Sequence, residues 1–184
     1  MLSDKIWVTR KTRIYTEQRL QGISNITQAL MVAYSLALVS LSIWNLQSNA
    51  PKLNVISAFT SIVVLVLSVY LIAQKYSERS IAMRNCYIKL DELYSRAKRA
   101  EANKDENGLE DLESEYTSLL INIENHSEYD YLCLRYSLKN NKDTTLPPFT
   151  KADHIQYLWG ITWRVILTVI AFAISLPFIV FIWL

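Results

Sequence analysis

The residues from 53 to 73 read LNVISAFTSIVVLVLSVYLIA and contain no charged side chain. About 20 apolar residues in a helix are needed to cross roughly 30 Å of hydrocarbon, and this stretch meets that requirement. Two further stretches lack charge in the same way, one from Leu20 to Pro51 and one from Val165 to Leu184. We therefore predict three membrane spans, near residues 26–46, 53–73 and 165–184.

The apolar segments could instead be buried helices of a soluble protein. The chain has only 184 residues, which leaves too little polar sequence to enclose three such helices. The first segment is too long for the apolar region of a signal peptide and leads directly into the second span, so we expect it to be retained. With 51% hydrophobic residues, three Gly and four Pro, the composition favours helices. The predicted fold class is an all-α integral membrane protein.

Basic residues flank the predicted spans unequally. Five lysines or arginines precede the first span and seven follow the second within residues 75–99, whereas the connector 47–54 carries only Lys52. By the positive-inside rule, the N-terminus and the middle region are cytoplasmic and the C-terminus is periplasmic or extracellular. Trp159 and Trp163 fall where an aromatic belt is expected before the third span.

The middle of the chain, residues 76–138, shows helical periodicity. Apolar and aromatic residues recur at steps of three and four in two stripes, which are separated by the polar segment 103–108. The stripes are Met83, Tyr87, Leu90, Tyr94 and Ala97, then Leu109, Leu112, Tyr116, Leu119 and Ile123. This pattern predicts an antiparallel helical hairpin whose first helix continues the second span without a break.

The segments on either side of this region have their own signals. The basic, amphipathic stretch 7–22 is expected to lie along the membrane surface. Residues 139–150 are predicted to form a loop, because Pro147 and Pro148 disfavour a helix. Thr150 and Asp153 have the spacing of a capping pair at the start of the last helix.

The sequence contains no Gly-rich phosphate loop, no Cys/His metal pattern and no nucleophile elbow, so we predict no enzymatic activity, no metal and no cofactor. One polar cluster resembles chemistry, and it comprises Glu124, Asn125, His126, Asp130 and Tyr131. On one helix, His126 and Asp130 would share a face and could perform acid–base work. The alternative, which we favour, is a polar contact that fixes this segment against the basic N-terminal segment or a neighbouring subunit.

Uncharged polar residues fall on one face of each predicted span. They are Gln28, Ser35, Ser42 and Asn45 on the first, Asn54, Ser57, Ser61 and Ser68 on the second, and Thr168 and Ser175 on the third. In an oligomer these faces could wet a pore, and within one subunit they could serve helix packing. The absence of an ionisable residue in mid-span argues against a proton-coupled transporter.

The order of these features resembles the SLATT family, the SMODS and SLOG-associating two-transmembrane effector domains. A basic N-terminus, a two-span hairpin with a short connector and a helical hairpin ending in the polar cluster carry the resemblance, over about residues 7–138. We accordingly expect a SLATT-like domain at 1–138, a loop at 139–150 and a C-terminal helix at 151–184. The third span is then a departure from the family or a subfamily feature.

The resemblance implies an effector of a prokaryotic anti-phage defence system in the bacterial inner membrane. It would oligomerise on activation and permeabilise the membrane, causing growth arrest or death of the infected cell. Its regulatory partner would be a reverse transcriptase with its nucleic acid, or a nucleotide-signal synthase, and no small-molecule substrate is indicated. The alternative function is a non-catalytic membrane anchor that recruits a cytoplasmic partner through the helical hairpin.

Overall fold

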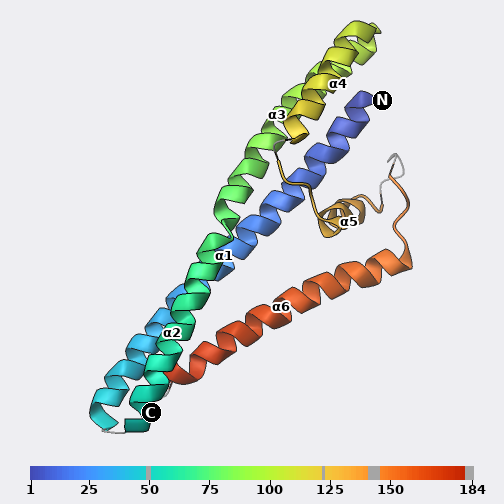
Figure 1. The fold of residues 1–184 in the computed structure, drawn as a ribbon. Helices are drawn as coiled ribbons and strands as arrows, with labels where there is room; N and C mark the ends of the chain where they lie inside the picture. The colour runs from blue at the N-terminus through green and yellow to red at the C-terminus, as the bar shows by residue number, and fades with distance from the viewer. Residues whose placement is uncertain (49–50, 122, 141–145, 181–184) are drawn as a thin grey trace. The chain divides into compact units, whose positions relative to one another are not determined.

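The computed structural model describes residues 1–48, 51–121, 123–140 and 146–180, and in these residues it contains helices and no strand. The helices are α1 (Leu2–Ser48), α2 (Pro51–Ala73), α3 (Tyr76–Asn103), α4 (Glu106–Ile121), α5 (Glu128–Ser137) and α6 (Lys151–Val180) (Figure 1). The predicted all-α class is confirmed. Residues 49–50 of the predicted connector and 181–184 of the predicted third span lie outside the described residues.

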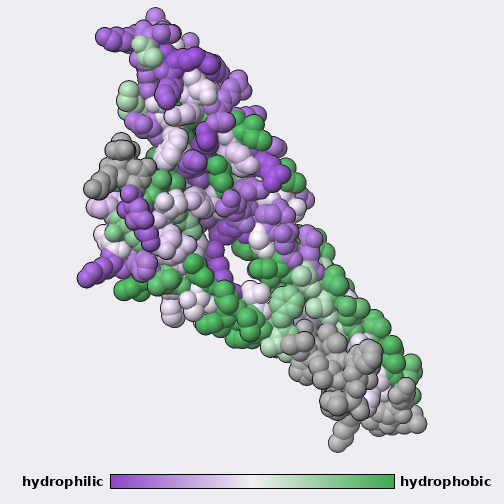
Figure 2. Space-filling view, turned by 180° about the vertical axis from the view of Figure 1, so that it is seen from behind, coloured by the Kyte–Doolittle hydropathy of each residue, from purple (hydrophilic) through white to green (hydrophobic). Residues whose placement is uncertain are grey.

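The helices form two compact units. The polar unit contains Met1–Gln21 and Ser77–Gly160, and the membrane unit contains Gly22–Tyr76 and Ile161–Leu184. Hydrophobic residues cover most of the described surface of the membrane unit that Figure 2 shows, and hydrophilic residues dominate the polar unit. Helices α1 and α6 each contribute residues to both units.

The membrane unit is built from three long apolar helical stretches, as predicted. Stretches of α1, α2 and α6 have the length and composition to cross a bilayer. At most 6% of the residues in each apolar window are buried inside the protein. The protein is therefore a membrane protein whose apolar side chains face lipid or other protein chains.

The polar unit has its core where the first part of α1 packs on the α3–α4 hairpin. Ile6, Leu90 and Ala97 are fully buried there, and Leu112 and Tyr116 of α4 complete the core. The burial extends along α1, where further buried residues are Thr12, Arg13, Thr16, Glu17 and Leu20. One face of residues 7–22 therefore packs against protein, and the expectation that this stretch lies along the membrane surface stays a prediction.

Two lysines in the left-handed backbone region end helices. Lys75 has φ 51° between α2 and α3, so the prediction that α3 continues the second span without a break is wrong. Lys104 has φ 55° after α3, and the Asp105 N–H donates to the Ala100 carbonyl at 3.1 Å. A 6→1 bond of this kind satisfies a carbonyl that the helix end would otherwise leave unpaired. It forms the chain reversal predicted at residues 103–108.

Candidate functional site

The predicted polar cluster straddles a break between two helices. Helix α4 ends at Ile121 and α5 begins at Glu128, so His126 lies in a non-helical segment and Asp130 in the first turn of α5. The expectation that His126 and Asp130 share one helix face is therefore wrong. Within the described residues, no hydrogen bond joins these two side chains.

Asp130 caps the helix in which it lies. Ser127 is the N-cap of α5, and its Oγ accepts a hydrogen bond from the Asp130 N–H at 3.3 Å. In return, Asp130 Oδ2 accepts from the Ser127 N–H at 3.1 Å and from the Ser127 hydroxyl at 2.8 Å. This capping box satisfies backbone donors that a helix start leaves unpaired.

The same carboxylate binds α1. Arg19 Nε donates to Asp130 Oδ1 at 2.8 Å and Arg19 Nη2 donates to Oδ2 at 2.9 Å, while the Thr16 hydroxyl donates to Oδ2 at 3.0 Å. Asp130 is only 1% exposed. Burial alone would raise the pKa of Asp130, but the hydrogen bonds from Arg19 and Ser127 outweigh it and hold that pKa below its ordinary value. The ionised Asp130 therefore docks α5 on α1.

Glu124 is held from two helices. Arg13 of α1, 2% exposed, donates to the Glu124 carbonyl oxygen, and it also lies 3.4 Å from the sulfur of Met83. Arg79 of α3 forms an ion pair with the Glu124 carboxylate at 2.8 Å. A cation just beyond the C-terminus of α4 also complements the helix dipole. The segment after α4 is thus fixed by two arginines, neither of which the sequence analysis assigned to the cluster.

His126 has an environment that disfavours its charged form. The ring is partly buried and lies 6.4 Å from the ring of Tyr131, centroid to centroid. Burial and the nearby Arg13 cation lower the pKa of His126, and Asp130 offsets this only in part. The Asn125 side chain accepts from the His126 backbone N–H at 2.9 Å. Burial and Arg13 thus favour the neutral imidazole, and among the residues that the structure describes no carboxylate is hydrogen-bonded to the ring.

A second capping aspartate lies at the start of α6. Asp153 Oδ2 accepts from the Thr150 N–H at 2.8 Å and from the Thr150 hydroxyl at 2.7 Å, which confirms the predicted capping pair. Asp153 also binds Arg135 of α5, with distances of 3.0 Å and 2.6 Å. These contacts, led by the bonds from Thr150, lower the pKa of Asp153 to about 2. Sequence reasoning missed Arg135, because no local spacing signals a contact between two separate helices.

The polar residues of the membrane unit mostly bond to their own helices. The hydroxyls of five residues donate to the carbonyl four positions earlier at 2.7–2.9 Å, namely Ser35, Ser42, Ser61, Ser68 and Thr168. Gln28 donates to the Ser24 hydroxyl at 3.2 Å, and the partly buried Ser57 supplies the carbonyl for Ser61. Asn45 and Asn54 bond to each other across α1 and α2. The side chain of Ser175 lies outside the described residues.

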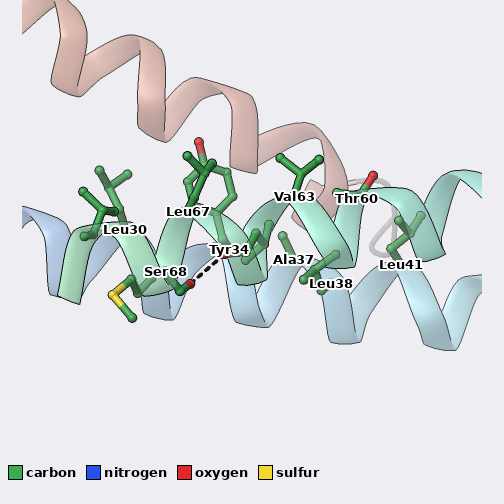
Figure 3. Close-up of a pocket in the computed structure, with 12 residues that line it drawn as sticks. Leu30, Tyr34, Ala37, Leu38, Leu41, Thr60, Val63, Leu67 and Ser68 are labelled. Carbon is green, nitrogen blue, oxygen red and sulfur yellow. Dashed lines mark hydrogen bonds between the residues drawn. The ribbon is translucent and has the colours of Figure 1, made fainter. Parts of the chain in front are cut away.

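An apolar groove of about 300 Å³ follows the line where α1 and α2 face each other (Figure 3). Its lining comprises Leu30, Met31, Tyr34, Ala37, Leu38, Leu41, Thr60, Val63, Val64, Leu67, Ser68 and Leu71. Tyr34 also reaches the third membrane helix, because its hydroxyl donates to the Ala171 carbonyl of α6 at 2.8 Å. No pattern in the sequence distinguishes Tyr34 from the other residues of the first span. The groove suits an apolar side chain or an acyl chain, since nearly all of its lining is hydrocarbon.

The chain was also compared with known proteins. Residues 1–183 match the family described as SMODS and SLOG-associating 2TM effector domain family 5, SLATT_5. This match includes α6, which the resemblance seen in the sequence had left outside the family domain. Comparison with the curated proteins and with the solved structures gave no match. The chain thus belongs to the SLATT family, as the resemblance implied, and within it to family 5.

Proposed function

We propose that this protein is a membrane effector of a prokaryotic anti-phage defence system, which oligomerises in the bacterial inner membrane and permeabilises it on activation. The outcome would be growth arrest or death of the infected cell. Membership of an effector-domain family and the three apolar helices support this proposal. The protein would act without catalysis.

The observation that carries the proposal is the near absence of burial in the membrane unit. At most 6% of the residues in each apolar window are buried, so the faces of all three helices are open to further contacts. Three helices are too few to enclose a pore, and several copies would have to line one. The exposed Ser35, Ser42 and Ser61 would suit such a lining, because a hydroxyl that donates to its own helix can still accept a hydrogen bond from water.

The proposal includes an orientation and a restraint. The polar unit would lie in the cytoplasm and the C-terminus outside, as the distribution of lysine and arginine favours. A regulatory partner encoded nearby would hold the effector silent until infection. We propose a reverse transcriptase with its nucleic acid, or a nucleotide-signal synthase, as that partner.

The test is expression of the protein alone in bacteria, with membrane potential followed by a voltage-sensitive dye. We expect wild type to depolarise the cells and Ser61→Leu to reduce the effect at equal membrane content, because the leucine replaces a water-accepting group. Val66→Leu is the matched control on the same helix, since Val66 is 61% exposed and already apolar. If wild type reaches the membrane and never depolarises it, the anchor function would replace this one.

A further inference from the structure

We propose that α5 is a clasp that holds the start of α6 to α1 and keeps the effector inactive until α5 is released. The inference rests on the proposed function, because inactivity is defined by the absence of membrane leakage. The clasp is a short helix that the sequence pattern does not distinguish from α4.

The place of α5 depends on its contacts with other helices. It spans only Glu128–Ser137, and non-helical residues lie on both sides of it. Isolated helices shorter than about 12–15 residues are marginal in water. The segment is therefore ordered by docking, and a change that undocks it also removes the reason for it to stay helical.

On one side, α5 is docked to α1. Asp130 binds Arg19 through two hydrogen bonds and Thr16 through a third, and the carboxylate is almost completely buried. Leu132 and Leu134 are also buried, at 4% and 1% exposure. Breaking a buried ion pair by removing one partner is strongly unfavourable, because the other charge is left without compensation. Loss of Arg19 should therefore release α5.

On the other side, α5 grips the start of α6. Arg135 binds Asp153 through both carboxylate oxygens, and the Tyr136 and Tyr157 rings stack with centroids 4.1 Å apart. Tyr129 lies so close to Gly160 that a Cβ there would stand 2.3 Å from Tyr129 Cε2. The absence of a side chain at Gly160 therefore permits this contact, and a larger residue would push Tyr129 away.

The two sides are connected through aspartates with the same double role. Asp130 caps α5 and binds an arginine of α1, while Asp153 caps α6 and binds an arginine of α5. Release of α5 thus takes Arg135 away from Asp153, the capping residue of α6. It also removes the surface on which the start of α6 packs. Because α6 continues from Lys151 to Val180, a change at its start reaches the membrane unit along a single helix. Such a coupled element can have two arrangements, docked and released.

The test uses the full chain with one variant on each side of α5, Arg19→Gln and Gly160→Leu. Arg96→Gln is the matched control, because it removes an exposed ion pair between α3 and α4 that does not involve α5. Two quantities are measured, hydrogen exchange of residues 128–137 in the detergent-solubilised protein and depolarisation of cells at equal membrane content. We expect both release variants to exchange α5 amides at least tenfold faster than wild type and to depolarise cells at lower expression, with Arg96→Gln unchanged.

Two outcomes would overturn the clasp. One is unchanged exchange of α5 in both variants, which would mean that these contacts do not hold it. The other is faster exchange of α5 without increased depolarisation, although wild type at high expression does depolarise the cells. That result would contradict the inhibitory role of α5 and leave the proposed function intact. If no protein depolarises the cells at any expression level, the proposed function fails, and the inhibitory role of α5 fails with it.

Discussion

At the scale of single residues, the Asp130 side chain serves both in a helix cap and in an ion pair between two helices. Its two carboxylate oxygens accept hydrogen bonds from Arg19, Thr16 and Ser127, so both oxygens of the buried charge are hydrogen-bonded. Burying a carboxylate is unfavourable unless it is paired and hydrogen-bonded. This requirement explains why a helix cap and an interhelical ion pair coincide at one position.

Replacing Asp130 should therefore be costly. We predict that Asp130→Ala lowers the free energy of unfolding of the polar unit by about 3–5 kcal/mol, because α5 loses the carboxylate half of its capping box and the buried Arg19 contact loses its partner. Chemical unfolding of the purified protein in detergent measures this. Asp91→Ala is the control, because the Asp91 side chain is 61% exposed and pairs with Arg10 at the surface; it should cost about 1 kcal/mol or less. Equal costs for the two variants would contradict the role of Asp130.

His126 gives the polar unit a pH dependence of known sign. Its pKa in the folded protein lies below the ordinary 6.5, mainly because of burial and then because of Arg13. Between the two pKa values the unfolded chain binds more protons, so stability falls as pH drops below about 6.5. We predict that the midpoint temperature of thermal unfolding is lower at pH 5.5 than at pH 7.5. The His126→Gln variant should show a smaller difference between the two pH values. The exposed His154 gives the control variant His154→Gln, and an equal flattening there would argue against His126.

At the scale of elements, the α3–α4 hairpin was predictable and its details were not. Met83, Leu90 and Ala97 of the predicted stripe are buried, whereas Tyr87 and Tyr94 are only partly so. Their neighbours Cys86 and Leu93 take the buried places, because two adjacent faces of α3 are covered by α1 and α4. Helical periodicity gives the direction of burial, but it does not tell how many helices cover that direction.

The hairpin core can be tested with two residues on one helix. Leu90 is fully buried and Ile88 is 56% exposed. We predict that Leu90→Ala lowers the free energy of unfolding by about 2–5 kcal/mol through lost burial and a cavity. Ile88→Ala should change it by about 0.5 kcal/mol or less. Denaturant titration of both variants checks this, and the packing described for α3 is wrong if the exposed site proves the more costly one.

The break before α5 illustrates what the sequence alone could not reveal. No Gly or Pro lies between α4 and α5, so the pattern reads as a continuing helix. The helix ends because Arg13 and Arg79 hold Glu124 from outside, and α5 restarts at Ser127, whose capping box with Asp130 is also bound by Arg19. Sequence runs without charged residues identified the membrane helices. The conformation and the partners of the polar cluster instead depend on contacts between segments that are distant in the sequence. The contact of this cluster with the basic N-terminal segment was weighed from the sequence, yet its partners could be named only from the structure.

Tyr34 offers a test of the packing among the membrane helices. We predict that Tyr34→Phe lowers stability by about 0.6 kcal/mol, since it removes one interhelical hydrogen bond to the Ala171 carbonyl. Unfolding in mixed detergent micelles measures the loss. Tyr70→Phe is the control, because Tyr70 is 61% exposed. A Tyr34 variant as stable as the Tyr70 variant would mean that this bond does not hold α6.

At the scale of the whole molecule, the two units differ in how they satisfy their side chains. The polar unit buries a core and pairs its buried carboxylates within one chain. The membrane unit leaves its apolar windows almost unburied, and its serines satisfy themselves on their own helices. The polar unit thus buries its own core, whereas the apolar faces of the membrane unit remain available for contact with other chains in the bilayer. This contrast is the physical reason to expect self-association of an effector-family protein in the membrane.

The most direct test uses purified protein in sealed liposomes that hold a potassium diffusion potential, read by a voltage-sensitive dye. We predict that Gly160→Leu collapses the potential at a lower ratio of protein to lipid than wild type. With the additional Ser61→Leu replacement, the vesicles should keep their potential at that ratio. Such a result would show that this chain alone permeabilises a bilayer. If the vesicles keep their potential at every ratio although the protein is inserted, the protein does not open membranes and the central claim is contradicted.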